Sequence, residues 1–376
     1  MQLYLKNFAS RNFRNLVESQ IELHPRFNLF VGENGQGKTN VLEAIYYLLT
    51  LRPMRPVRPR QLIAWGEQET TVQGELTGRV ERKLTVRFDK KKRNLKINGA
   101  PPLRIDDYLY DTQVVAFTPE DLQLVRGAPD LRRRFLDRAI FHTDINYLSE
   151  VRQYIRILKH RNAHLRSNKV DPQLLEVLNE QFVAWASRIL RRRIAVLGRL
   201  QPYMQQAFNR IFPEQDVTVD LSYSTQLGNL SHLNEGMSPS LVEEDLQQNL
   251  KSQLERYKQR ELDRRSTLVG PHLDDIQFTF QNRPFKVSAS QGQTRALVLA
   301  LKVAEIFDIQ ERTQQHPILL LDDVAGELDP RHSSFLFEFL EETPGQVLLS
   351  TTTRESIQLP DLDRYPHFTL RAGELQ

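Results

Sequence analysis

The sequence has no cysteine among its 376 residues, which excludes disulfide bonds and thiolate metal ligands. Long apolar runs are also lacking: runs such as Ala296–Leu301 and Ile318–Leu321 are far too short to cross a bilayer. The first residues show no charged leader followed by an apolar stretch, so we expect no signal peptide. These absences predict a cytoplasmic protein that has no membrane partner.

Positive charge is distributed unevenly. The formal net charge is +4, but the segment Arg126–Phe212 holds 17 Lys and Arg against 7 Asp and Glu, a net of +10. The rest of the chain therefore carries a net of −6. Such a sector indicates a surface for a polyanion, although charge runs are often plain solvated helix faces. The candidate contact residues are Lys90, Lys91, Lys92, Arg93, Arg132, Arg133, Arg134, Arg191, Arg192 and Arg193.

Hydrophobic periodicity divides the chain into three parts. Alternating runs predict strands within residues 2–31 and 70–98, and residues 41–51 have the spacing of a helix. From about Asp130 the spacing becomes helical, mainly in residues 131–165 and 174–212. Strands at 275–280, 284–287, 318–321 and 347–350 then alternate with helices at 292–312 and 331–342. We therefore expect one α/β domain with a mostly parallel sheet, made of residues 1–125 and 266–376 and interrupted by a helical lobe at 126–265.

A complete phosphate-loop motif, G-x-x-x-x-G-K-[ST], follows the third predicted strand and precedes the first predicted helix. In such a loop the glycines let backbone N–H groups surround phosphates, the Lys38 ammonium neutralises phosphate oxygens, and the Thr39 hydroxyl binds Mg²⁺. The motif predicts ATP and Mg²⁺ as cofactors. The predicted ATP-binding residues are Gly32, Glu33, Asn34, Gly35, Gln36, Gly37, Lys38, Thr39 and Asn40.

A second acidic motif ends the apolar run Ile318–Leu321. Four apolar residues after a proline are typical of a buried central strand, whose carboxyl end lies at the sheet edge. An acid there reaches the Mg²⁺ beside Thr39, and Asp322 has this position. Asp323 follows directly and is placed to accept a proton from the attacking water. We expect Lys38 and Asp323 to be catalytic, and Thr39 and Asp322 to bind the metal.

The segment from Ser290 to Arg295, Ser-Gln-Gly-Gln-Thr-Arg, comes before a long apolar helix. Read by itself, it is either a capped core helix or a helix N-terminus suited to a phosphate. Its distance of about 30 residues before the acidic strand resembles the signature motif of ABC and SMC ATPases. The resemblance implies that Ser290, Gly292, Gln293 and Arg295 contact ATP held by a second subunit. It also implies that Asp329 belongs to the D-loop, and that ATP joins two heads in a homodimer.

Further motifs resemble the RecF family of gap-repair proteins, in that family's order along the whole chain. They begin with Asn12–Leu16 and continue through Phe117–Leu122, Gly127–Asp137 and Gly270–Asp275. The resemblance implies an ABC/SMC-type ATPase head with slow hydrolysis. It also implies partners in gapped or single-strand/double-strand junction DNA and in recombination mediator proteins.

The chain departs from the pattern of ABC transporters in three places. Asp323 replaces the usual glutamate, Ser350 and the threonines after it replace the switch histidine, and no clear Q-loop glutamine is present. Glu120 and Gln113 are the nearest substitutes for that glutamine. We hypothesise an ATP-switched clamp on DNA that helps to load recombinase. The alternatives are a transporter ATPase subunit, disfavoured by the missing histidine, and an SMC-like tether, disfavoured by the absence of long coiled-coil heptads.

Overall fold

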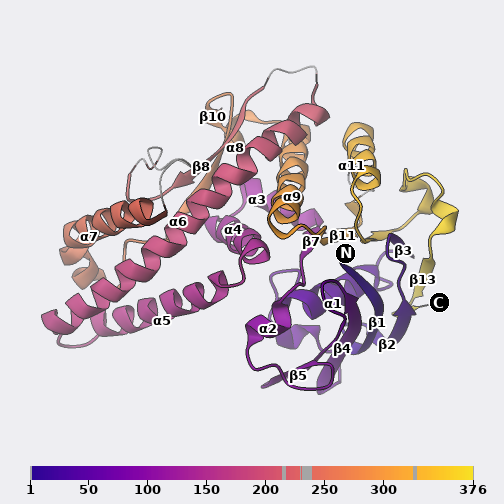
Figure 1. The fold of residues 1–376 in the computed structure, drawn as a ribbon, viewed down its shortest axis with the longest axis horizontal. Coiled ribbons are helices and arrows are strands. Elements are labelled where there is room, and N and C mark those ends of the chain that lie inside the picture. Colours follow the sequence, from indigo (N-terminus) through magenta and orange to yellow (C-terminus); the bar gives the residue numbers. More distant parts are fainter. Residues whose placement is uncertain (1, 214–216, 229, 231–238, 325–327, 376) are drawn as a thin grey trace. The chain divides into compact units, whose positions relative to one another are not determined.

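The computed structural model describes residues 2–213, 217–228, 230, 239–324 and 328–375, which form two compact units (Figure 1). Unit 1 comprises Met1–Leu122, Ala207–Gln215 and Ser290–Gln376, and unit 2 comprises Gln123–Gln206 and Asp216–Ala289. We expected the inserted lobe to end at residue 265, whereas residues 266–289 belong to unit 2. The reason is strand pairing within that unit, because β9 (Asp275–Phe280) pairs with β8 (Val219–Ser224).

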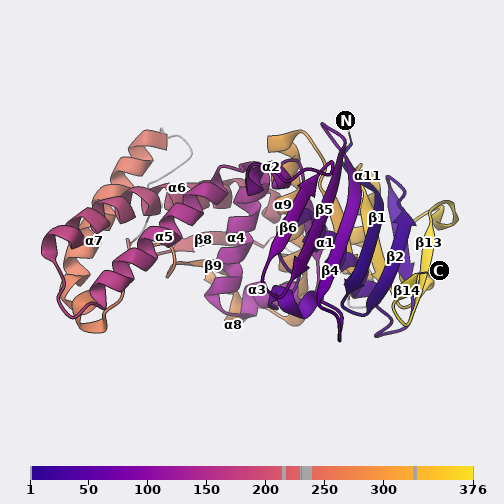
Figure 2. The same ribbon diagram turned by 90° about the horizontal axis from the view of Figure 1, so that it is seen from below.

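Unit 1 contains an antiparallel sheet of five strands in the order β2-β1-β4-β5-β6 (Figure 2). Side chains of β4 and β5 alternate between buried and more exposed positions, which is the period of a sheet with one face on the core. The strands are β1 (Tyr4–Phe13), β2 (Leu16–Glu22), β4 (Glu69–Thr77), β5 (Arg82–Asp89) and β6 (Arg93–Ile97).

The second sheet of unit 1 has the strand order β14-β13-β3-β12-β11-β7. All its pairs are parallel except β13 with β14. Strands β7, β11 and β12 are buried along their whole length, as expected of parallel strands that are covered on both faces. The predicted mostly parallel sheet of an ATPase head is confirmed. The strands are β3 (Phe27–Val31), β7 (Val114–Phe117), β11 (Ile318–Asp322), β12 (Val347–Thr351), β13 (His367–Arg371) and β14 (Glu374–Leu375).

Helix α1 (Lys38–Thr50) packs against strands of both sheets of unit 1. Every residue from Val41 to Thr50 is buried, because a helix enclosed on all sides has no solvent face. This packing fixes the position of its N-terminus. The remaining helices of unit 1 are η1 (Pro59–Leu62), α2 (Ile105–Leu109), η2 (Pro119–Leu122), α9 (Gln291–Thr313), α11 (Pro330–Glu342), η3 (Arg354–Ser356) and η4 (Leu362–Arg364).

Unit 2 is mainly helical, and α5 lies alongside α6 in both views (Figures 1 and 2). Its helices are α3 (Gln123–Arg126), α4 (Pro129–Thr143), α5 (Tyr147–Leu165), α6 (Pro172–Ile211, whose last turn belongs to unit 1), α7 (Pro239–Arg264) and α8 (Phe285–Ser288). No helix of the described residues combines the length and the apolar character needed to cross a membrane.

Unit 2 also contains a three-stranded antiparallel sheet, in the order β10-β9-β8, which we did not expect in a helical lobe. The prediction of a strand at 284–287 is wrong. Only Arg283–Pro284 pairs, as β10, and Phe285–Ser288 is a single helical turn. That turn is stabilised by the Ser288 hydroxyl, which donates to the Pro284 carbonyl at 3.0 Å, and by burial of the Phe285 ring.

A buried ion pair joins α5 to α7 within unit 2. The Arg161 guanidinium lies 2.5 Å from a Glu261 carboxylate oxygen, and both side chains are 2% exposed. Arg161 also donates to Asn179 at 2.8 Å and to Thr267 at 2.7 Å. The second carboxylate oxygen of Glu261 accepts from the Leu268 N–H at 2.7 Å. Each nitrogen of Arg161 and each carboxylate oxygen of Glu261 therefore has a hydrogen-bond partner, which offsets the cost of burying two charges.

Replacing Glu261 with Ala is expected to lower the free energy of unfolding by about 3–5 kcal/mol, because Arg161 would stay buried without its counter-ion. Urea unfolding followed by circular dichroism measures this loss. The exposed pair between Lys258 and Glu255 on the same helix is the control, and Glu255→Ala should change stability by less than about 1 kcal/mol. Equal effects of the two variants would contradict a structural role of the buried pair.

Candidate nucleotide site

The phosphate loop connects β3 to α1 and needs glycine at two positions. Gly35 and Gly37 have φ angles of 82° and 112°, in the region that side chains disfavour. A side chain at Gly37 would also come within 2.9 Å of the Asn15 amide oxygen. The chain therefore turns sharply into α1, and the N-terminus of this buried helix is directed at the loop, as in an anion site.

Lys38 is the first residue of α1 and folds back over the loop. Its ammonium donates to the carbonyls of Gly32 at 2.5 Å and Glu33 at 3.1 Å. Burial lowers the pKa of Lys38, while the nearby carboxylates of Asp323 and Asp322 act to raise it. A positive charge is thus held inside the curve of the loop, next to two acids.

Thr39 and Asp322 meet although 283 residues separate them. The Thr39 hydroxyl donates to Asp322 Oδ1 at 2.7 Å, and the Ser350 hydroxyl donates to the same oxygen at 2.8 Å. The sheet order explains this, because β12 lies between β3 and β11 and brings Ser350 between the phosphate loop and Asp322. Sequence reasoning noted the serine only as the place of a missing histidine, and its hydroxyl is part of the site.

Hydroxyl and carboxylate oxygens at this spacing suit a hard cation such as Mg²⁺, which keeps few protein ligands and binds substrate phosphates as well. The described residues contain no group of three or more His, Cys, Asp or Glu side chains that would hold a metal by themselves. Thr39 and Asp322 therefore fit a Mg²⁺ ion that arrives with a nucleotide.

Asp323 has a left-handed backbone, with a φ of 52°. Its N–H donates to the Ser350 carbonyl at 3.2 Å and to the Ser350 hydroxyl at 2.9 Å. Burial raises the pKa of the Asp323 carboxyl, the Lys38 ammonium opposes this, and the Asp322 carboxylate adds to it. A carboxylate with a raised pKa is a stronger base than an ordinary aspartate.

Arg55 is a site residue that the sequence did not reveal. Its guanidinium lies 3.4 Å from Asp322 Oδ2 and 3.6 Å from a carboxylate oxygen of Glu120. The only signal in the sequence is the Pro/Arg-rich stretch at 52–60, whose composition is typical of an exposed loop. The contact also connects Glu120, one of the two substitutes for a Q-loop glutamine, with Asp322, the carboxylate predicted to bind the metal.

The other predicted loop residues have structural contacts or face solvent. Gln36 accepts from the Ala372 N–H at 2.5 Å, and Asn40 donates to the Asn15 side chain at 2.7 Å. Glu33 and Asn34 lie at the surface of the loop.

The signature segment forms the N-terminus of α9. Ser290 caps the helix: its hydroxyl accepts from the Gln293 N–H at 3.1 Å, and the Gln293 side chain accepts from the Ser290 N–H at 2.8 Å. This reciprocal pair is a capping box. Gly292 lies in the first turn, where a side chain would meet only the Ser290 hydroxyl and the His332 ring, at 3.9 and 4.0 Å. The cap leaves the end of a 23-residue helix open to solvent.

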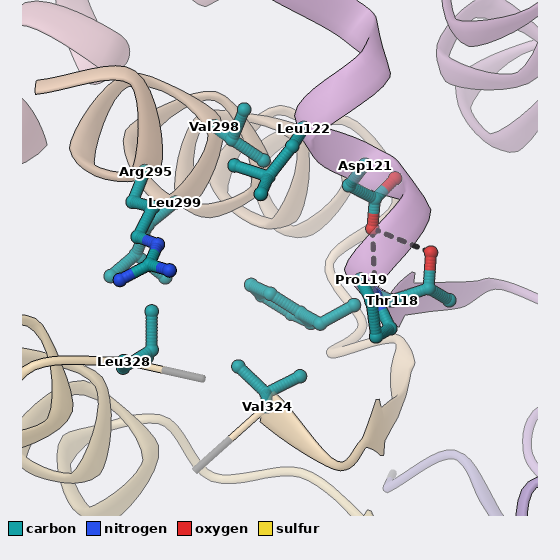
Figure 3. A pocket seen from close by; sticks show the side chains of 10 residues that line it. Thr118, Pro119, Asp121, Leu122, Arg295, Val298, Leu299, Val324 and Leu328 are labelled. Atoms are coloured by element: carbon teal, nitrogen blue, oxygen red, sulfur yellow. Dashed lines mark hydrogen bonds between the residues drawn. The ribbon is translucent and has the colours of Figure 1, made fainter. Parts of the chain in front are cut away.

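Arg295 reaches into a small pocket of about 50 Å³ within unit 1 (Figure 3). The pocket is too small for a nucleotide, since ligand sites measure about 300 Å³ or more. The residues that line it come from the signature helix α9, from the segment at and after the end of β7, and from positions near the predicted D-loop. The lining residues are Phe117, Thr118, Pro119, Asp121, Leu122, Arg295, Val298, Leu299, Val324 and Leu328.

Asp329 caps helix α11. One carboxylate oxygen accepts from the backbone N–H groups of Arg331 at 3.1 Å and His332 at 3.2 Å, and the other lies 2.6 Å from His332 Nδ1. Desolvation acts to raise the pKa of Asp329, but the interactions with His332 outweigh it, and the net direction is downward. Residues Gly326 and Glu327 of the predicted D-loop lie outside the described residues.

The candidate DNA contacts fall into two groups. Lys90, Lys91, Lys92 and Arg93 are exposed at the β5–β6 hairpin. Several arginines of unit 2 are instead bonded within the unit: Arg132 to Asp275, Arg133 to the Asp274 carbonyl, Arg134 to Asp130, Arg191 to Glu243, Arg192 to Asp144 and Glu150, and Arg193 to Asp137. Arg132 and Arg193 are also buried. Ion pairing and burial make these two poorly suited to bind phosphate.

The mixed sheet, the phosphate loop and the acidic strand end define an ABC/SMC-type ATPase head. The family model for the RecF/RecN/SMC N terminal domain matches residues 4–364. The chain is 38% identical over 376 residues to the DNA replication and repair protein RecF of Geobacter sp. (strain M21), covering 100% of both chains. It is 40% identical over 343 residues to the protein of the same name from Myxococcus xanthus (strain DK1622), covering 91% of this chain and 88% of that protein.

Solved structures agree with the family model. The recombination mediator protein RecF with ATP superposes with a TM-score of 0.87 at 29% identity, covering 100% of this chain and 97% of that one. The Smc head domain of Pyrococcus furiosus, at a TM-score of 0.56 and 14% identity, shares the fold. The chain belongs to the RecF family, and it is an SMC-like, ATP-binding protein of DNA replication and repair.

Proposed function

We propose that this protein is an ATP-switched DNA clamp of recombinational gap repair, which dimerises around ATP and opens when ATP is hydrolysed. The observation that carries the proposal is the convergence of Lys38, Thr39, Asp322 and Asp323 at one end of the parallel sheet. A charge-neutralising lysine, two metal-binding oxygens and a base are the groups that phosphoryl transfer requires.

In the proposed mechanism, Lys38 leaves its carbonyl partners in the loop and binds the β- and γ-phosphate oxygens. Thr39 and Asp322 would hold Mg²⁺, which would neutralise charge on these phosphates. Asp323 accepts a proton from the water that attacks the γ-phosphate. Because aspartate is one methylene shorter than the glutamate of transporters, we expect slow turnover, which suits a switch.

A second subunit would complete the site. Among the described residues, the hydrogen bonds of Ser290 are all within the first turn of α9. Helix N-termini bind anions, so this end is suited to the γ-phosphate held by a partner head. Asp329, exposed by 42% at the start of α11, is the proposed D-loop contact across the same interface.

The proposed partners are gapped or junction DNA and recombination mediator proteins. Support comes from the exposed Lys90–Arg93 cluster and from the related RecF structure, which is described as a mediator of the RecFOR pathway. DNA contacts of this kind depend on phosphate charge, so affinity should fall steeply as salt increases.

Binding of gapped duplex DNA is expected to be tight with ATP and weak with ADP or without nucleotide. Ser290→Arg should abolish the effect of ATP, because a large cation would fill the space for the partner's γ-phosphate. The measurement is fluorescence anisotropy of labelled DNA over a salt series. Ser252→Arg, on the exposed face of α7, has the same charge change and should behave like the wild type. DNA binding that is absent, or indifferent to nucleotide, would overturn the clamp.

A further inference from the structure

Helix α5 of unit 2 carries basic side chains on the face opposite its buried side. Its buried residues include Tyr154, Ile157 and Leu165. Arg156, Lys159 and Arg166, the residue that follows the helix, are exposed. At 3.6 residues per turn these three lie within an arc of about 80°, on the other side of the helix from the buried residues. We refer to Arg156, Lys159 and Arg166 as the α5 stripe.

The α5 stripe carries positive charges for which the described part of the chain provides no ion-pair partner. Among the described residues, none of its three side chains takes part in an ion pair, unlike the candidate arginines of α4 and α6. The only acid on α5 is Glu150, and it is bound to Arg192 at 2.6 Å. The stripe is therefore a concentration of positive charge that faces solvent.

The acidic side chains of the neighbouring helix α6 line a cavity that does not include the α5 stripe. Glu176 and Glu180 of α6 line a cavity of about 250 Å³ among α5, α6 and α7, together with Lys251 and Lys258. The α5 stripe is not part of this lining. Glu176 and Glu180 therefore lie at this cavity, and in the part of the chain that the structure describes neither of them forms an ion pair with the stripe.

We infer that the α5 stripe binds the sugar–phosphate backbone of duplex DNA, a surface that rests on the proposed DNA-binding function and adds a contact in unit 2. From Arg156 to Arg166 the stripe extends about 15 Å, which is the rise of about four base pairs. A protein partner fits less well, because the core of a protein interface is depleted of charged residues and enriched in aromatic ones, whereas all three stripe residues are charged and none is aromatic. Contacts to phosphate carry no sequence preference, as a clamp requires.

The first test removes the three charges with Arg156→Gln, Lys159→Gln and Arg166→Gln in one variant of the full chain. Glutamine keeps the helix propensity of these positions. With ATP present, affinity for duplex DNA at about 0.15 M salt should fall on the order of tenfold. The slope of log affinity against log salt should become shallower by about 0.9 for each phosphate that the variant no longer neutralises. ATP binding should stay unchanged, because the site residues are intact.

The matched control removes three exposed charges of α7 with Lys251→Gln, Arg256→Gln and Lys258→Gln, and should keep the wild-type salt slope. If the wild type binds DNA with ATP but the stripe variant keeps its affinity and slope, the stripe inference is overturned and the clamp stands. Equal decreases in both triple variants would also overturn it, because net charge would explain them. If the wild type binds no DNA in any nucleotide state, the proposed function and the inference both fail.

A second test does not depend on removing charge and uses the absence of cysteine. Ala163 is exposed one turn beyond Lys159, so Ala163→Cys places a unique thiol within the stripe. After this thiol is labelled with a photoactivated cross-linker, the protein should cross-link to duplex DNA at low salt. The cross-linking yield should fall strongly at about 0.5 M salt. Ser252→Cys on α7 should cross-link several-fold less. Equal yields at the two positions would contradict a specific contact at α5.

Discussion

Asp323→Asn is expected to lower the rate of ATP hydrolysis by about 10²–10⁴-fold while ATP binding is kept, because the amide cannot accept a proton from the attacking water. Asparagine tolerates the left-handed backbone found at this position, where φ is 52°, so the fold should be unaffected. Single-turnover release of phosphate measures the rate. The ATP-bound dimer on DNA should persist longer in the variant, since reopening needs hydrolysis.

The pH dependence of ATP hydrolysis by the wild type should be set by ionisation of the Asp323 carboxyl group. Burial raises the pKa of Asp323, with Lys38 opposing and Asp322 adding to the shift. Only the ionised form acts as base, so the rate should fall as the pH falls through that raised pKa, and Asp323→Asn should lose this dependence. Asp322→Asn is the control for loss of a neighbouring carboxylate. It should make ATP binding depend less on Mg²⁺, an effect that is not expected of Asp323→Asn. A wild-type rate in Asp323→Asn would place the base elsewhere, with Glu120 next to Arg55 the first candidate.

Lys38→Ala is expected to lower hydrolysis by about 10²–10³-fold and to weaken ATP binding at least tenfold. Removal of one donor to the charge that develops in a transition state costs this much, and a hydrogen bond to a charged group contributes about 1.5–3 kcal/mol to binding. The variant also lacks the ammonium that bonds to the Gly32 and Glu33 carbonyls, so the empty loop should be less ordered. Isothermal titration with ATP and a phosphate-release assay measure the two effects.

Lys6→Ala provides the control for removal of a lysine, since Lys6 is exposed on β1 and has no part in the loop. It should bind and hydrolyse ATP like the wild type. Tight binding of ATP by Lys38→Ala would mean that the helix N-terminus and loop amides supply most of the phosphate affinity. The role proposed for Lys38 would then be wrong.

The sequence by itself determined the parts of the site that are continuous in the chain. The phosphate loop must curve around phosphate wherever strand, glycines and helix follow one another, because glycine geometry and the helix N-terminus are local properties. An apolar run ending in two acids likewise predicts a central strand with carboxylates at the sheet edge. The mostly parallel sheet of an ATPase head followed from these motifs and from the alternation of strands and helices, and the structure confirms it.

Only the tertiary structure decided which distant side chains meet. Ser350 and Arg55 contact Asp322 because of strand order and a loop path, and neither is encoded in local periodicity. The arginines differ in availability for the same reason, the tertiary structure. Arg132 is paired with an acid 143 residues away, whereas Arg156 on α5 faces solvent. A charge in a sequence is only a potential contact, because burial and ion pairing, which depend on residues far along the chain, determine whether it remains available to a partner.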